Sequence, residues 1–113
     1  MPSLETCKNL IKEISEVKGW GNDPSTKIFY AMIELGEAGD VWKHRGDEGY
    51  LEGIGIHNEQ EFNDFICEEL IDTLFYVLDC FSCIDSKINP DDCFNKKLSK
   101  NWKRDRVYLD DTR

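Results

Sequence analysis

The sequence predicts an all-α fold, a four-helix bundle-like single domain over residues 1–113. Apolar residues recur at the three- and four-residue spacing of amphipathic helices, capping signals precede these segments, and no segment alternates like a strand. The chain has 113 residues, of which 40% are hydrophobic. That is enough apolar surface for a core, which in chains of this size a second copy sometimes completes. We therefore expect a helical bundle.

The first two helices are predicted over residues 3–17 and about 24–43. The first has apolar residues on one face at Leu4, Cys7, Ile11, Ile14 and Val17. The segment "KGWGNDP" ends it, and Asp23 can cap a second helix that has Pro24 at its first position. The apolar face of the second helix holds Ile28, Ala31, Met32, Leu35, Ala38 and Trp42.

Four glycines between residues 44 and 58 predict a loop after the second helix. Asn58 and Glu61 resemble a capping box, so a third helix is expected from about 59 to 84. Its main apolar stripe is Leu70, Leu74, Val77, Leu78 and Phe81. Asn89 and Pro90, followed by two acids, predict a fourth helix to about residue 104. No structure is assigned to residues 106–113.

Charge and hydropathy exclude two classes of partner. Charged residues make up 33% of the chain and the formal net charge is -9, which argues against a polymeric nucleic acid, since Lys and Arg supply such binding. No stretch approaches the roughly 18 to 20 apolar residues of a membrane span, and the N-terminal segment lacks the apolar region of a signal peptide. We therefore expect a cytoplasmic protein without a membrane partner.

The five cysteines are odd in number, and Cys80 and Cys83 form a CxxC. This pair lies inside an apolar helical stretch, and no second CxxC accompanies it. A zinc or redox site is the less favoured interpretation, and we expect reduced thiols in or beside the core.

Two acidic pairs are the first candidates for a functional site. Glu34 and Glu37 are three residues apart, as are Glu69 and Asp72, so on a helix each pair aims two carboxylates at one point. Apolar or aromatic residues share both faces, whereas Glu68 faces away and is expected to be solvated. The pairs are either an acidic solvated surface or a Mg²⁺ site, because Mg²⁺ takes a few carboxylates together with substrate phosphates.

Lys97, Asn101 and Arg104 share one face of the fourth predicted helix, and we call them the basic ridge. A lysine and an arginine suit phosphate oxygens, and the asparagine adds a neutral donor and acceptor. The alternative is a basic last turn that complements the helix dipole. Trp20 also has two interpretations: it stacks on a base, or it forms a wedge between the first two helices.

In this order, the motifs resemble the MazG-like branch of the all-α nucleoside triphosphate pyrophosphatases. "WGNDPSTKIFYAMIELGEAGDVWK" is similar to the opening acidic helix of that family, "EELIDTLFYVLDCF" to its second acidic helix, and "KLSKNWKR" to its Lys, Asn, Arg spacing. The resemblance covers most of the chain. It implies hydrolysis of an NTP or dNTP to the monophosphate and pyrophosphate, dependent on Mg²⁺ with Mn²⁺ as a substitute.

The resemblance also implies roles for individual residues. The metal ligands and catalytic carboxylates would be Glu34, Glu37, Glu69 and Asp72, and the substrate-binding residues Lys97, Asn101 and Arg104. It further implies that oligomerisation completes the bundle: the expected assembly is a homodimer or a dimer of dimers, in which helices from neighbouring subunits complete each site. Two rivals stay open: a related pyrophosphohydrolase that acts on phosphoribosyl-ATP or dUTP, and a non-catalytic helical oligomer that serves as a binding module.

Overall fold

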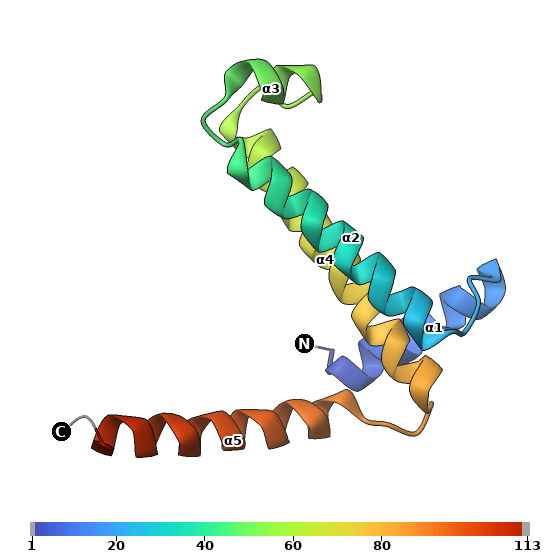
Figure 1. The fold of residues 1–113 in the computed structure, drawn as a ribbon. Helices are drawn as coiled ribbons and strands as arrows, with labels where there is room; N and C mark the ends of the chain where they lie inside the picture. Colours follow the sequence, from blue (N-terminus) through green and yellow to red (C-terminus); the bar gives the residue numbers. More distant parts are fainter. Residues whose placement is uncertain (1, 112–113) are drawn as a thin grey trace.

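The computed structural model describes the backbone of residues 2–111 and the side chains of residues 2–103. Within these limits the chain is all-helical, with no strand, as predicted. Its five helices are α1 (Leu4–Lys18), α2 (Pro24–Lys43), α3 (Glu48–Gly53), α4 (Glu59–Ile84) and α5 (Pro90–Asp111) (Figure 1). None of the helices in the described residues combines the length and the apolar character that crossing a membrane requires.

Helices α2 and α4 form a long antiparallel hairpin, and local capping sets where each begins. The Asp23 carboxylate accepts a hydrogen bond from the Ser25 backbone N–H at 3.0 Å, and Pro24 opens α2. The Asn58 side chain accepts from the Glu61 backbone N–H at 2.8 Å, and the Glu61 carboxylate accepts from the His57 N–H at 2.7 Å. These caps satisfy N–H groups that have no partner within the helix, which confirms the predicted starts.

The connection between α2 and α4 corrects one prediction, because the expected loop over residues 44–58 contains the short helix α3. Asp47 caps it by accepting from the Tyr50 N–H at 3.0 Å. Leu51 then packs against a small cluster of the buried residues Val41, Ile56 and Phe62. Gly46 and Gly55 therefore flank a short helix that contains the other two glycines, Gly49 and Gly53, and that has its own cap and its own apolar contact.

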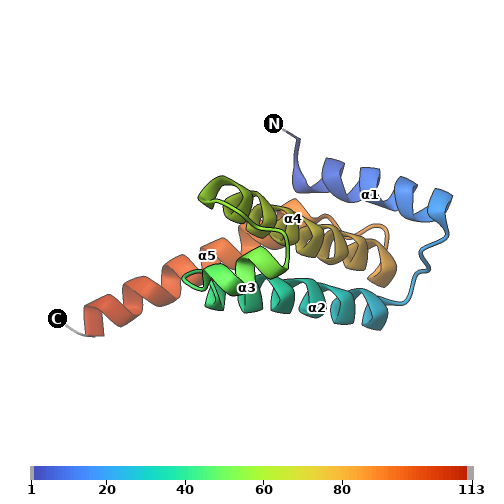
Figure 2. The same ribbon diagram turned by 90° about the horizontal axis from the view of Figure 1, so that it is seen from above.

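Helix α1 packs across α4, and α5 leaves the base of the hairpin beside α1 (Figures 1 and 2). The Asp91 carboxylate accepts from the backbone N–H groups of Leu4 and Glu5 at 3.0 and 3.1 Å. Lys8 is fully buried, and its Nζ donates to the carbonyl of Ser86 at 3.0 Å and to that of Ile88 at 2.6 Å. These bonds set the direction of α5, which continues beyond the predicted end near residue 104.

The four long helices do not enclose a common core within one chain. The radius of gyration is 18.0 Å, whereas a compact domain of this length has about 13 Å. Much of the predicted apolar surface is exposed, including Val17 on α1, Ile28, Met32, Leu35 and Trp42 on α2, and Leu70, Leu74 and Val77 on α4. Ile11, Ala38 and Leu78 of the predicted apolar faces are buried, but the described part of the chain leaves most of their other members exposed.

Candidate functional site

Residues of α2 face residues of α4 in pairs along the hairpin, and the step from one pair to the next covers the same number of residues on both helices. We call this row of facing residues the seam. The Nζ of Lys27 lies 2.8 Å from the Oδ2 of Asp79. Three residues onward on α2 and three back on α4, the rings of Tyr30 and Tyr76 have centroids 5.4 Å apart. Because residues three or four apart lie on one helix face, the next turns bring the acidic pairs of the two helices into the same row.

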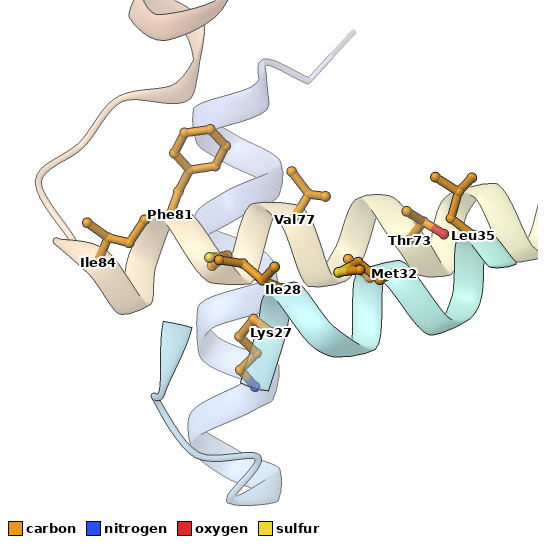
Figure 3. A pocket seen from close by; sticks show the side chains of 10 residues that line it. Lys27, Ile28, Met32, Leu35, Thr73, Val77, Phe81 and Ile84 are labelled. Atoms are coloured by element: carbon orange, nitrogen blue, oxygen red, sulfur yellow. The ribbon is translucent and has the colours of Figure 1, made fainter. Parts of the chain in front are cut away.

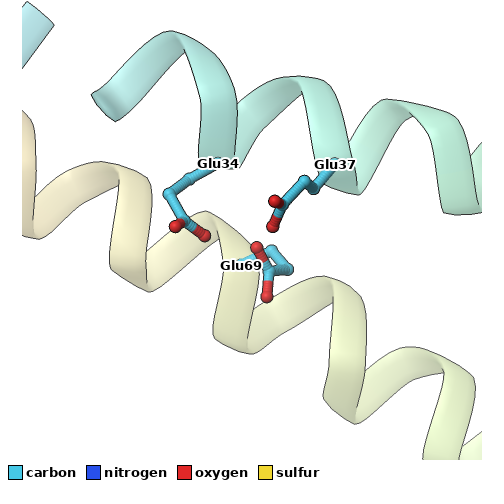
Figure 4. Close-up of side chains that lie close together, drawn as sticks. All are labelled: Glu34, Glu37 and Glu69. Atoms are coloured by element: carbon cyan, nitrogen blue, oxygen red, sulfur yellow. The ribbon is translucent and has the colours of Figure 1, made fainter. Parts of the chain in front are cut away.

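Three of the four predicted acidic ligands come together in the seam. One carboxylate oxygen each from Glu34, Glu37 and Glu69 lies within 4.8 Å of the others, and we call these residues the acidic cluster. Their side chains point toward one another from the two facing helices (Figure 4). Asp72 is not part of this group; it lies one turn along α4 and lines an adjoining cavity together with Glu34. Glu68 is exposed, as predicted.

The acidic cluster is electrostatically strained. The Oε2 of Glu69 is buried and has no hydrogen-bond partner in the described part of the chain. The pKa of the Glu69 carboxyl is raised from 4.5 to about 7, first by a hydrogen bond with Glu34, then by burial and the charges of Glu34, Glu37 and Asp72. Such a shift means that gathering these anions costs free energy unless a positive charge joins them. The cluster is therefore suited to take up a proton or a cation.

The donor set of the acidic cluster fits a hard divalent cation. Carboxylate oxygens are the ligands that Mg²⁺ prefers, and Mg²⁺ uses few protein ligands because it keeps waters or substrate oxygens. Glu34 and Glu69 are partly buried and Glu37 is exposed, so the group is open on one side. The buried Oε2 distinguishes Glu69 from a carboxylate on a fully solvated acidic face.

A cavity of about 540 Å³ adjoins the acidic cluster. Its walls include the aromatic residues Trp20, Tyr30, Phe75 and Tyr76, and Glu34 and Asp72 stand among its acidic residues. Burial raises the pKa of the Tyr76 hydroxyl, as do the charges of Glu34 and Asp72. Trp20 is 49% exposed and lines this cavity, so its indole is accessible from it.

Of the basic ridge, Lys97 and Asn101 make no contact with the acidic cluster among the residues whose side chains are described. Lys97 is exposed and Asn101 is partly buried on α5, which points away from the hairpin (Figure 1). Among the described residues, no hydrogen bond or ion pair joins either side chain to Glu34, Glu37 or Glu69. Arg104 belongs to α5, but its side chain lies outside the described residues.

The Lys27–Asp79 ion pair is the feature of this region that the sequence patterns did not indicate. Its side chains are only 3% and 5% exposed. The available signal was weak: a lysine within the apolar second helix and an aspartate within the apolar stretch of the third. The sequence does not indicate that these two residues pair, because their contact depends on how α2 and α4 align.

The cysteines agree in part with the prediction of reduced thiols in or beside the core, because Cys67 and Cys93 are exposed. All five are free; Cys80 is buried and Cys83 is partly buried. Burial raises the pKa of both thiols, which favours the unreactive protonated form. The Cys80 thiol also donates to the Pro24 carbonyl at 3.7 Å, and this contact joins the ends of α2 and α4.

Comparisons of the chain with models of protein families, with characterised proteins and with solved structures find no match. The functional argument therefore depends on the site itself. Two antiparallel helices bring three carboxylates together at the edge of an aromatic cavity. This arrangement can hold a cation next to a ligand that has both an apolar ring and anionic groups.

Proposed function

We propose that this chain is a MazG-like, Mg²⁺-dependent nucleoside triphosphate pyrophosphohydrolase. The oxygen of one water bonds to one of the two phosphorus atoms of the anhydride between the α- and β-phosphates, and the bond from that phosphorus to the bridging oxygen breaks. The monophosphate and pyrophosphate leave, and the proton of the attacking water passes to a base. The observation that supports this function is the convergence of Glu34, Glu37 and Glu69, with a buried and unpartnered oxygen, beside an aromatic cavity. A nucleotide combines the ring that such a cavity suits with the phosphates that a bound cation attracts.

The carboxylates of the chain have distinct roles in the proposed reaction. Glu34, Glu37 and Glu69 hold Mg²⁺, or Mn²⁺ in its place, and Asp72 stands one turn away beside the same cavity. A cation held there would supply positive charge to the phosphate oxygens and would lower the pKa of a bound water. A carboxylate that is free of the cation can orient this water and accept its proton.

The phosphate tail is held by the basic ridge, Lys97, Asn101 and Arg104. Residues 96–104 contain Lys96, Lys97, Lys100, Lys103 and Arg104 and no acidic residue. This basic segment complements the acidic seam in charge, but in one chain the two lie on diverging helices. The proposed site is therefore completed by α5 of a second copy, in a homodimer or a dimer of dimers.

A second copy also accounts for the apolar surface of the hairpin. On the side away from the acidic cluster, α2 and α4 form an open apolar groove of about 340 Å³, lined by Ile28, Met32, Leu35, Val77, Phe81 and Ile84 (Figure 3). Helix α5 exposes Phe94, Leu98 and Trp102 at four-residue spacing. Contiguous apolar surface of this kind marks an interface, and the large radius of gyration agrees with a chain that needs a partner to become compact.

The test is pyrophosphate release from a panel of nucleotides with Mg²⁺ and without it. Release from NTPs or dNTPs that stops in chelator supports the proposed function. Release from phosphoribosyl-ATP or dUTP alone supports the related pyrophosphohydrolases in its place. No release from any member of the panel overturns the enzyme function and favours a non-catalytic helical oligomer.

A further inference from the structure

The buried ion pair between Lys27 and Asp79 has no role in holding metal or phosphate in the site described above. Both residues line the cavity of about 540 Å³, and their side chains are almost completely buried. Removing two charges from water costs free energy that their attraction only partly returns, so an apolar pair of similar volume is often at least as stable. A charged pair in the wall of a cavity is therefore better explained by a ligand than by stability.

Each member of the pair keeps an unused hydrogen-bonding position. An ammonium group has three N–H donors; the Lys27 Nζ gives one to Asp79 Oδ2 at 2.8 Å and one to the Trp20 carbonyl at 3.2 Å. The third has no partner among the described residues. No described residue donates to the other carboxylate oxygen of Asp79, its Oδ1. The wall thus offers one donor and one acceptor side by side.

The Lys27 side chain is oriented so that the unused donor and acceptor lie on the polar side of the hairpin. Lys27 also borders the apolar groove on the opposite side, but its nitrogen points away from the groove's apolar side chains (Figure 3). Its charged end meets Asp79 and the Trp20 carbonyl at the 540 Å³ cavity. The aliphatic part of the lysine side chain therefore packs with apolar groups, while its ammonium group faces the cavity.

The other walls of this cavity suit a planar ring. Tyr30 and Tyr76 form a tilted aromatic pair with centroids 5.4 Å apart, and Trp20 presents a half-exposed indole. Aromatic side chains bind nucleobases by stacking, and polar groups in the same plane then bind the base edge. Every nucleobase presents an N–H or amine next to a ring nitrogen or carbonyl oxygen, which matches a donor beside an acceptor.

We propose that Lys27 and Asp79 bind the edge of the substrate's base in this cavity. Lys27 donates to a ring nitrogen or carbonyl oxygen, and Asp79 Oδ1 accepts from the neighbouring N–H. This inference rests on the proposed function, because the acidic cluster would hold the triphosphate of the same molecule. Lys27 and Glu34 are two turns apart on α2, about 10 Å along its axis, a separation that a base and its sugar can span.

The experiment measures equilibrium binding of nucleosides, which lack phosphates, in chelator by calorimetry and by tryptophan fluorescence, to which Trp20 contributes. We expect Asp79→Asn to weaken nucleoside binding roughly tenfold or more, the loss typical of a charge-assisted hydrogen bond. The same variant should bind inorganic triphosphate with Mg²⁺ as the wild type does. The double variant Lys27→Met with Asp79→Asn nearly keeps both side-chain volumes and removes both charges, so it leaves no unpaired buried lysine and tests the pair if Asp79→Asn alone unfolds.

Lys8→Met is the matched control, because Lys8 is an equally buried lysine that binds backbone carbonyls outside the cavity. It should lower stability and leave nucleoside affinity unchanged. A wild type that binds no nucleoside, or folded pair variants with affinity within about twofold of wild type, would overturn the base-edge proposal. Pyrophosphate release by the wild type tests the hydrolase separately, so either proposal can fail while the other stands.

Discussion

One carboxylate oxygen of Glu34 on α2 and one of Glu69 on α4 lie within 4.8 Å of each other across the seam. Glu34 is the largest cause of the raised Glu69 pKa, through the hydrogen bond that a protonated carboxyl donates at this position. Two carboxylates share such a bond only when one of them carries a proton. Without a cation, the cluster therefore retains a proton at a pH where an ordinary glutamate is ionised. A metal ion that enters must displace this proton, which couples the proposed chemistry to stability and pH in ways that can be measured.

Glu69→Gln should abolish pyrophosphate release and leave the helical signal in far-UV circular dichroism unchanged. We expect activity to fall at least about 100-fold, since even outer partners of metal ligands typically contribute ten- to hundredfold. Glu68→Gln is the matched control, because Glu68 is adjacent in sequence and exposed. Equal activity in the two variants would remove Glu69 from the proposed site.

Glu34→Gln should affect the metal-free and the Mg²⁺-loaded proteins in opposite directions. Removing one carboxylate relieves repulsion within the cluster, so the melting temperature in chelator should rise at pH 8. Mg²⁺ at about 100 times its dissociation constant stabilises the wild type by roughly 2.7 kcal/mol per site, or about 10 °C in a chain of this size. This further rise should shrink in the variant.

The measurement is a set of thermal melts in chelator and in millimolar Mg²⁺ at constant ionic strength. Glu68→Gln again serves as the control and should change neither melting temperature appreciably, because exposed charges interact weakly. A wild type that gains nothing from Mg²⁺, together with a variant that melts no higher in chelator, would contradict the metal site.

The stability of the metal-free protein should fall as pH rises from about 4.5 to about 7. Between these values the folded state holds a proton on Glu69 that the unfolded state has released, since the folded pKa is raised from 4.5 to about 7. A state that binds more protons becomes less favoured as pH rises, and the loss is complete above the folded pKa. Glu69→Gln removes this titrating group.

Urea midpoints at several pH values in chelator, taken as the difference between wild type and Glu69→Gln, isolate this contribution. The stabilisation by Mg²⁺ should show the opposite trend and grow as pH rises through about 7, because the cation needs the deprotonated carboxylate. A wild-type slope that survives in Glu69→Gln would assign the pH dependence to other groups.

Two inactive variants should restore activity when mixed, if α5 of one copy completes the site of another. One carries Glu69→Gln, and the other carries Lys97→Ala with Arg104→Ala. In a symmetric dimer, a mixed pair contains one site with both defects and one site with neither, so full exchange should return roughly a quarter of wild-type activity. If the mixture stays inactive after unfolding and refolding, the acidic cluster and the basic ridge of the same chain act together.

Lys8→Met should destabilise the protein by about 3 kcal/mol, the usual cost of removing one partner from a buried charged contact. Its ammonium binds the carbonyls of Ser86 and Ile88 and lies 3.2 Å from a Glu5 carboxylate oxygen. Lys12→Met, one turn further along α1, is the control; its ion pair with Glu16 is exposed and long at 3.9 Å. The urea midpoint should fall for Lys8→Met and barely change for Lys12→Met.

Local signals in the sequence predicted the long helices well. Asp23, Pro24 and Asn58 act within one turn of themselves, so their effect can be inferred without a fold. Glycine content misled the prediction for residues 44–58, because the Asp47 cap and the contact made by Leu51 outweigh it. The end of α5 was also missed, since no clear stop signal follows residue 104.

Long-range relationships were predicted less completely. The spacing within each helix indicated that Glu34 pairs with Glu37, but not that Glu69 would be closer to them than Asp72. That choice depends on the alignment of two helices, which packing decides. The same alignment joins Lys27 to Asp79. The exposure of the apolar faces could not be predicted for a different reason. Hydropathy indicates which residues prefer to be buried, but not whether they are buried by the same chain or by a second one.

The equal steps of the seam also limit which insertions and deletions this protein can tolerate during evolution. Adding residues to the 44–58 connection lengthens the turn and leaves both helices aligned. Adding one residue inside α2 between Lys27 and Glu34 rotates everything beyond it by about 100°, so the acidic pair and the ion pair would leave the common face. Natural length variation in related chains should therefore collect around α3 and avoid the stretches 27–37 and 69–79.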